Sequence, residues 1–227
     1  MSADAPSAIE IQQLAKDYRA PDGSVTPVLR IAELHLPLNN EMAIRGKSGS
    51  GKTTLLNILA GLLLPTSGQV RVLGQDMAVL SEAARDRFRA HTIGFVFQTP
   101  HLLAGFSAIE NILLAMRAAS KVPKQQQAHH AQLLLERVGL ADRMNHKPAQ
   151  LSSGQQQRVA VARAIANRPR LILADEPTAH VDDANGQRVM SLLRSYCAEQ
   201  GAALLLASHD RDVLATFACV HSLENNP

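Results

Sequence analysis

The sequence has few aromatic residues and few cysteines, and each shortage argues against a class of function. It contains five Phe, two Tyr and no Trp, too few for the stacked aromatic surface that binds single-stranded nucleic acid. The formal net charge is only +3, and basic residues are interspersed with acidic ones, so we expect no nucleic-acid partner. The two cysteines, Cys197 and Cys219, form no CxxC pair or ligand cluster, which predicts reduced thiols in a cytosolic protein.

Long apolar runs are also lacking. The longest, residues 55–64, is interrupted by Asn57 and is much shorter than the roughly 20 residues of a transmembrane helix. We therefore expect a chain that does not cross a bilayer by itself. Hydrophobic residues nevertheless make up 46% of the sequence, which is ample for a globular core.

One glycine-rich segment matches a phosphate-binding loop residue for residue, and we call it the phosphate loop: Gly46, Lys47, Ser48, Gly49, Ser50, Gly51, Lys52 and Thr53. It lies between a short apolar run and a helical pattern that begins at Thr54, the order of strand, loop and helix that the motif requires. Its glycines let backbone N–H groups point at phosphate oxygens, next to a helix N-terminus. Lys52 is expected to reach the β- and γ-phosphates, and the Thr53 hydroxyl to bind Mg²⁺. The segment predicts a nucleoside triphosphate ligand, with Thr54 among the binding residues.

A second motif is an apolar run, residues 171–176, that ends in two carboxylates. This pattern is typical of a buried parallel strand that delivers acids to the carboxyl edge of its sheet, where ligands of α/β proteins bind. Asp175 is expected to hold Mg²⁺, and Glu176 to polarise the water that attacks the γ-phosphate. The alternative is two surface acids after a strand, with Pro177 as its stop.

A third motif, the signature segment, opens a predicted helix with Leu151, Ser152, Ser153, Gly154 and Gln155. Serine, glycine and a helix N-terminus together form an anion site. Taken alone, the segment could equally be a plain helix cap. A small-molecule kinase with a phosphate loop would not need this segment, so its presence weighs against that class of enzyme.

The apolar pattern predicts strands at residues 9–14, 28–36, 42–44, 69–73, 93–97, 171–174 and 203–207. The early strands crowd the first third of the chain, whereas the later ones alternate with helical patterns, which favours a small antiparallel β region joined to a parallel α/β core. Residues 99–157 show no strand pattern, and residues 125–140 form an amphipathic helical pattern. We predict a single domain in which residues 1–98 and 158–227 form the nucleotide-binding core and residues 99–157 an inserted helical subdomain.

Together with Gln98 and His209, each of which follows a predicted strand, these motifs resemble the ATP-binding cassette (ABC) ATPase family. The resemblance extends from Tyr18 to His209. It implies a P-loop NTPase fold with a RecA-like core, ATP and Mg²⁺ as ligands, and hydrolysis of ATP to ADP and phosphate.

The resemblance also implies roles for single residues. Tyr18 corresponds to the aromatic residue that stacks on adenine, Gln98 to the residue that senses Mg²⁺ and the attacking water, His209 to the histidine that contacts the γ-phosphate, and Asp182 to the aspartate of the D-loop (residues 179–182). The catalytic set is then Lys52, Gln98, Glu176 and His209. In this family the signature segment belongs to the partner's site, so two copies of the chain sandwich two ATP molecules and Ser152, Ser153, Gly154 and Gln155 contact nucleotide across a homodimer interface.

Residues 42–44, 55–61 and 93–98 look like the lipoprotein-release and macrolide-export branch of bacterial ABC ATPases. This resemblance implies a peripheral subunit on the inner face of the cytoplasmic membrane that powers export or lipoprotein release. It also implies an integral membrane permease docked near Pro100, Leu102, Leu103 and Phe106, although these residues could instead be core of the helical block. A non-transport ATPase of the FtsE type, which transmits a signal through a membrane partner, is the alternative function.

Two segments depart from the family pattern. Ser153 stands where the usual Leu-Ser-Gly-Gly-Gln has its first glycine, which adds a Cβ and a hydroxyl where the backbone runs close to phosphate. We expect weakened hydrolysis. The D-loop reads Ala179, His180, Val181 and Asp182, where the branch commonly has Gly-Asn-Leu-Asp.

Overall fold

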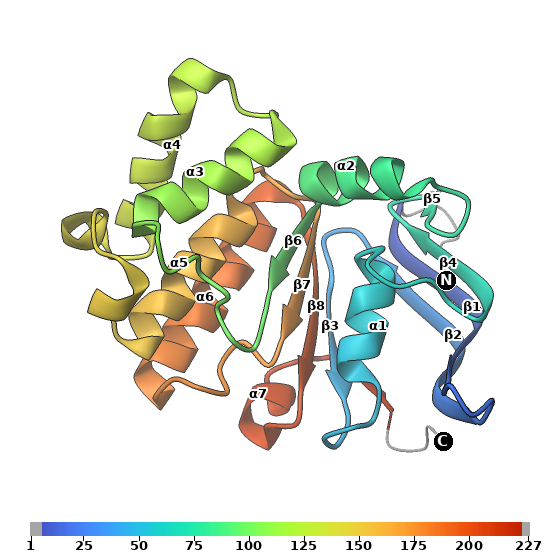
Figure 1. The fold of residues 1–227 in the computed structure, drawn as a ribbon. Helices are drawn as coiled ribbons and strands as arrows, with labels where there is room; N and C mark the ends of the chain where they lie inside the picture. The colour runs from blue at the N-terminus through green and yellow to red at the C-terminus, as the bar shows by residue number, and fades with distance from the viewer. Residues whose placement is uncertain (1–5, 224–227) are drawn as a thin grey trace.

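The structure, a computed structural model that describes residues 6–223, contains two β-sheets of different kinds, one in the middle of the molecule and one at its side (Figure 1). One is antiparallel, with the order β2-β1-β4-β5, and the other is parallel, with the order β6-β7-β8-β3-β9. The antiparallel strands are β1 (Ser7–Arg19), β2 (Val25–Pro37), β4 (Ser67–Val72) and β5 (Gln75–Asp76). The parallel strands are β3 (Glu41–Arg45), β6 (Ile93–Val96), β7 (Leu171–Asp175), β8 (Ala203–Ser208) and β9 (Val220–Ser222).

The parallel sheet is buried on both faces because its central strands carry apolar residues on both sides. Successive side chains of a strand point to opposite faces. Leu171 and Leu173 therefore pack with helix α1 (Lys52–Leu59), whereas Ile172 and Ala174 pack with α5 (Ser153–Ile165) and α6 (Asp183–Gln200). Burying a side chain of this size stabilises the fold by about 1.5–3 kcal/mol, so the sheet is a rigid base for the loops at its edge.

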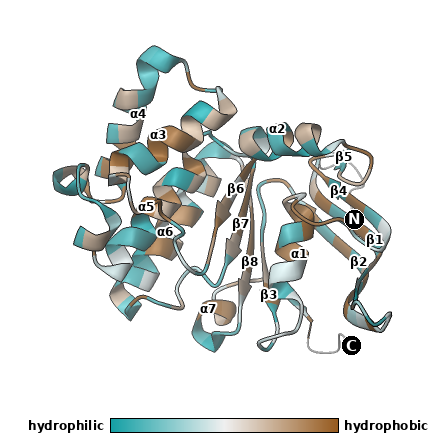
Figure 2. Ribbon diagram, in the orientation of Figure 1, coloured by the Kyte–Doolittle hydropathy of each residue, from teal (hydrophilic) through white to brown (hydrophobic). Residues whose placement is uncertain are grey.

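Helices α2 (Glu82–Thr92), α3 (Ala108–Ala119), α4 (Lys124–Arg137) and α7 (Arg211–Ala215) complete the fold with two short 3₁₀ turns. Helix α3 begins at a capping box of Ser107 and Glu110. Helix α4 ends before Gly139, whose φ of +68° lies outside the range of a right-handed helix. Figure 2 shows apolar residues along β6, β7 and β8, whereas α2 is largely hydrophilic and buries none of its residues.

The structure confirms the predicted fold class and every predicted strand. The predicted strand at residues 42–44 is β3, which joins the parallel sheet rather than the antiparallel one. Strands β5 and β9 were not predicted, because two or three residues are too few to show a pattern. The structure has no strand within residues 99–157, as predicted, and the expected helix at 125–140 is α4, which ends three residues earlier. Among the helices of residues 6–223, none is both long and apolar enough to span a membrane.

Candidate functional site

The phosphate loop connects β3 to α1, as its sequence predicted. Gly51 is the N-cap of α1 with a φ of +92°, and a Cβ there would lie 2.9 Å from the carbonyl oxygen of Val28. Gly49 also has a left-handed φ, of +83°, which glycine adopts without the strain that other residues incur. No side chain caps the first turn of α1, and the N–H groups of such a turn attract an anion.

Lys52, the first residue of α1, is buried and folds back over the loop. Its Nζ donates hydrogen bonds to the carbonyl oxygens of Gly46, at 2.7 Å, and Lys47, at 3.1 Å. It also lies 3.4 Å from Oε1 of Glu176. The ammonium is therefore fixed beside the loop, where a phosphate oxygen would meet it.

Thr53 and Asp175 come together although 122 residues separate them in the sequence: the Thr53 hydroxyl donates a hydrogen bond of 2.7 Å to Oδ2 of Asp175. Burial raises the pKa of Asp175, and the neighbouring Glu176 raises it further, while the bond from Thr53 and the charge of Lys52 lower it. A hydroxyl and a carboxylate are the hard oxygen ligands that Mg²⁺ takes in nucleotide sites. The donor set thus fits the predicted metal.

Glu176 and His209 meet because β7 and β8 are neighbours and end at the same edge. Oε1 of Glu176 accepts a hydrogen bond of 2.7 Å from Nδ1 of His209, and Oε2 lies 3.4 Å from the donating hydroxyl of Ser208. Glu176 has a φ of +46°, and left-handed backbone at a residue other than glycine costs on the order of 1–3 kcal/mol. The conformation directs its carboxylate toward Lys52 and His209.

A cavity of about 250 Å³ joins these groups, and most of the predicted site residues line it. It is lined by Val28, Ser48, Gly49, Ser50, Gly51, Lys52, Thr53, Thr54, Gln98, Asp175, Glu176 and His209. Val28 is the one residue of this lining that the sequence reasoning missed, since an apolar residue in a strand carries no signal of a site.

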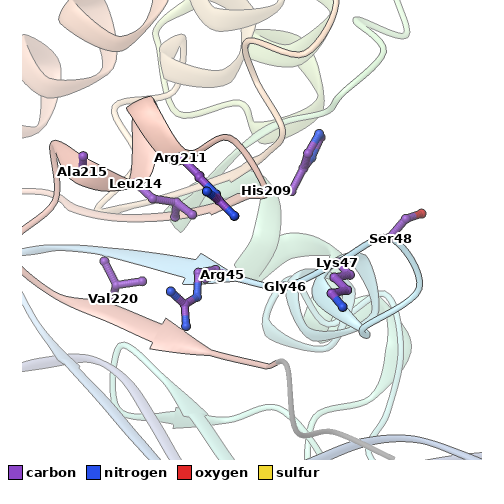
Figure 3. A pocket seen from close by; sticks show the side chains of 9 residues that line it. All are labelled: Arg45, Gly46, Lys47, Ser48, His209, Arg211, Leu214, Ala215 and Val220. Carbon is purple, nitrogen blue, oxygen red and sulfur yellow. The ribbon is translucent and has the colours of Figure 1, made fainter.

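Gly46 and Lys47 line a second, adjoining cavity of about 720 Å³ on the other side of the loop, between β3, α7 and β9. Figure 3 shows its basic residues, Arg45 from β3, Lys47 from the loop and Arg211 from α7, together with His209, which lines both cavities. The phosphate loop therefore contributes residues to both cavities, of which only the smaller is lined by carboxylates.

Tyr18 and the signature segment line neither cavity. Tyr18 lies on β1 with 44% of its side chain exposed, and Nζ of Lys16 lies 5.2 Å from the centre of its ring. Ser152 caps α5: its hydroxyl accepts from the N–H of Gln155, whose side-chain oxygen accepts from the N–H of Ser152.

Asp182 also lies outside both cavities, and it caps α6 by accepting hydrogen bonds from the N–H of Asn185, at 2.9 Å, and from its side-chain amide, at 2.7 Å. Asn185 in turn touches the signature segment, because a Cβ at Gly154 would lie 2.7 Å from Cγ of Asn185. The D-loop and the signature segment are therefore neighbours within one chain.

Comparison with known proteins decides the family. Residues 29–179 match the family model described as ABC transporter. The chain belongs to the ABC transporter family. It is 42% identical, over 91% of its length and 89% of the relative's, to the lipoprotein-releasing system ATP-binding protein LolD of Hydrogenovibrio crunogenus. It is 45% identical, over 91% of its length and 86% of the relative's, to the protein of the same name from Anaeromyxobacter dehalogenans.

Solved structures of ABC cassettes have the same fold. The dimeric structure of a post-hydrolysis state of the ATP-binding cassette MJ0796, bound to ADP and Pi, aligns with a TM-score of 0.88 at 33% identity, over 95% of this chain and 94% of that one. The protein cbiO1 of Clostridium perfringens, part of the transporter complex cbiONQ, aligns with a TM-score of 0.81 at 27% identity, over 96% of this chain and 84% of that one. The family and the fold inferred from the sequence are confirmed.

The predicted docking residues of this ABC chain divide into two kinds. Leu103 and Phe106 expose 45% and 42% of their surface, whereas Leu102 packs against the core of the helical block. Pro100 is half-buried. Beside them a groove of about 630 Å³ runs between α2, β6, α3 and α5, lined in part by Phe95, Phe97, His101 and Arg163.

Proposed function

We propose that this protein is the ATP-hydrolysing subunit of a membrane transporter of the lipoprotein-release type. The observation that supports it best is the position of Thr53, Asp175, Glu176 and His209 around one cavity beside the phosphate loop. A metal-binding pair, a buried carboxylate base and a phosphate cradle are the parts that hydrolysis of a nucleoside triphosphate needs. The names of the two relatives support the transporter and the lipoprotein-release type.

In the proposed reaction, the N–H groups of the phosphate loop and the ammonium of Lys52 bind the β- and γ-phosphates. Thr53 and Asp175, together with Gln98 of the same cavity lining, would hold Mg²⁺, which would neutralise phosphate charge. Glu176 accepts a proton from the water whose oxygen bonds to the γ-phosphorus as the bond to the ADP oxygen breaks. His209 orients that carboxylate through Nδ1, and because it lines the same cavity it would be able to contact the γ-phosphate.

We propose further that two copies of the chain complete each other's sites. Ser152, Ser153, Gly154, Gln155 and Asp182 line neither cavity at the phosphate loop of their own chain, so they are available to contact nucleotide held by a second copy. The dimeric structures of MJ0796 support this arrangement. Tyr18 is proposed to stack on adenine, because its ring is exposed and the next strand of its sheet carries Val28, which lines the phosphate cavity.

The membrane partner is proposed to dock where Leu103 and Phe106 are exposed, near Pro100 and Leu102. In this proposal the chain lies at the inner face of the cytoplasmic membrane, and the helical subdomain at residues 99–157 supplies the contact. The segment is also close to Gln98, so docking and hydrolysis would act on the same part of the chain.

Crosslinking tests this function in cells. A photo-reactive residue at Leu103 or Phe106 is expected to capture one integral membrane protein, whereas the same probe at Val79, which is 74% exposed and lies before α2, is expected not to capture it. Purified protein should hydrolyse ATP in the presence of Mg²⁺. Capture of soluble proteins alone would contradict the transporter assignment, and absence of ATP hydrolysis would contradict the enzyme.

A further inference from the structure

The segment that carries Gln98, residues 97–101, leaves the sheet where β6 ends and is held by side chains from other elements. The carbonyl oxygen of Phe97 accepts a hydrogen bond of 3.2 Å from Nε2 of Gln157. The carbonyl oxygens of Pro100 and His101 accept bonds of 2.7 and 2.8 Å from the two terminal nitrogens of Arg163. These bonds satisfy backbone carbonyl groups that have no partner strand beyond the end of β6.

Arg163 donates two of these three hydrogen bonds. Desolvation lowers its pKa below the usual arginine range, and no carboxylate of the described residues lies within ion-pair distance of it. A half-buried cation without an acidic partner is costly unless its donors are satisfied. The planar guanidinium presents its two terminal nitrogens to the two adjacent carbonyls in a fixed fork, a geometry that the compact ammonium of a lysine does not have.

Two further features define the conformation of this segment. His101 has a left-handed φ of +45°, and its ring meets the ring of Phe97 edge-on, with 5.2 Å between the centres. Gln98 lies between the two held ends, with the Gln157 contact one residue before it and the Arg163 contacts two and three residues after it. Its position in the lining of the phosphate cavity therefore depends on where α5 holds the segment.

The same helix begins at the signature segment, since Ser152 is its N-cap. Arg163 lies eleven residues further along, which is roughly 16 Å at 1.5 Å per residue. One continuous helix thus connects the signature segment to both ends of the Gln98 segment. Arg163 also lines the groove between α2 and α5. A molecule bound in that groove would therefore meet the guanidinium that holds the two carbonyls.

We propose that Arg163 is a positioning residue that fixes Gln98 at the phosphate cavity and makes it move with helix α5. The kinetic part of this inference rests on the proposed ATP hydrolysis, whereas the structural part does not. Gln98 reaches a metal-bound nucleotide correctly only while both carbonyls are held. Arg163 itself does not line the phosphate cavity.

The experiment compares R163Q and R163K with R87Q in the full chain. Arg87 is exposed and lines the same groove, and it makes none of the contacts to residues 97–101, so R87Q controls for lost charge. We expect R163Q to lower kcat about tenfold, equivalent to about 1.4 kcal/mol, while KM for ATP and the Kd for a fluorescent ATP analogue change less than about twofold because the phosphate loop is intact. R163K should recover part of kcat, since a lysine keeps one contact.

Hydrogen exchange supplies a measurement that does not depend on hydrolysis. The amides of Gln98, Thr99, His101 and Leu102 should exchange faster in R163Q than in the wild type or in R87Q, while those of α1 stay protected. A folded R163Q or R163K with wild-type kcat and unchanged exchange would overturn the proposal, as would equal losses of kcat in R163Q and R87Q. Should R163Q fail to fold, the R163K comparison decides. Wild-type protein without ATP hydrolysis overturns the proposed function alone, because the exchange result still tests the hold of Arg163 on residues 97–101.

Discussion

The Nζ atom of Lys52 lies 3.4 Å from the Oε1 atom of Glu176, and their side chains expose only 8% and 9% of their surface. This pair joins the phosphate loop to the end of β7, so the residue proposed to bind phosphate and the residue proposed to activate water share one buried contact. In such surroundings, removing one charge leaves the other buried without compensation, because little water is there to solvate it.

Replacing Glu176 with glutamine is expected to keep ATP binding and to remove most hydrolysis. Glutamine retains the shape and can accept the bond from His209, but it cannot take a proton, and loss of a general base costs about 10²–10⁴ in rate. Phosphate release and equilibrium binding of ATP measure the two effects. E136Q, at an exposed position of α4, should be unchanged. Hydrolysis by E176Q near the wild-type rate would refute the role of Glu176.

Replacing Asp175 with asparagine is expected to change stability in a direction that depends on pH. Because burial raises the pKa of Asp175 above its unfolded value of 3.8, the folded protein holds this proton more tightly, and the free energy of unfolding falls as pH rises through the window above 3.8. The D175N variant has no carboxyl group at this position, so its free energy of unfolding does not fall with pH for this reason. Its stability relative to the wild type should therefore increase from pH 4 toward neutral pH without divalent cations, measured by urea unfolding.

The same variant should lose Mg²⁺-dependent hydrolysis, because an amide is a poorer ligand than a carboxylate. D142N, at a side chain with 71% exposure, is the control for both measurements. A stability of D175N relative to wild type that falls as pH rises would show that Asp175 is not held in the way its burial indicates.

Replacing Gly154 with alanine is expected to disturb the D-loop through Asn185. The new Cβ would lie 2.7 Å from Cγ of Asn185, and such overpacking costs typically about 1–3 kcal/mol, more than the gain of up to ~1 kcal/mol that alanine brings over glycine in a helix. Thermal unfolding and ATP turnover should both decline. G105A, where a Cβ meets nothing within 4 Å, should be neutral.

A double variant separates this contact from other effects of alanine. N185A removes the two atoms nearest to the new Cβ, so G154A should cost less stability in the N185A background than in the wild type. Additive effects of the two substitutions would mean that Gly154 and Asn185 do not compete for the same space.

Replacing Ser153 with glycine is expected to raise turnover at saturating ATP between about two- and tenfold, equivalent to roughly 0.4–1.4 kcal/mol. Ser153 is exposed at the first position of α5, where a proposed second copy would bring its phosphates close to the backbone. S153A keeps the Cβ without the hydroxyl and should remain slow if the Cβ is the obstacle. Turnover of S153G no higher than that of the wild type would remove Ser153 as the cause of weakened hydrolysis.

Much of the site could be inferred from the chain because its signals are local. The left-handed glycines of the phosphate loop, the capping pair of Ser152 and Gln155, and the apolar run before Asp175 each depend on a few neighbouring residues, whose backbone preferences and periodicity act wherever they occur. The position of Arg163 had no such signal. An arginine in an amphipathic helix is ordinarily a solvated side chain, and only its contact with two carbonyls from residues 100 and 101 marks it.

The tertiary structure alone decides which of these local pieces meet. The strand order β6-β7-β8-β3 differs from the order along the chain, and it brings Thr53 to Asp175 and His209 to Glu176 across the edge of the parallel sheet. Packing of α5 against α6 sets Gly154 beside Asn185 in the same way. The physical reason is that propensity and capping act over a few residues, whereas the arrangement of strands follows from burying both faces of one sheet, a condition that the whole chain satisfies together.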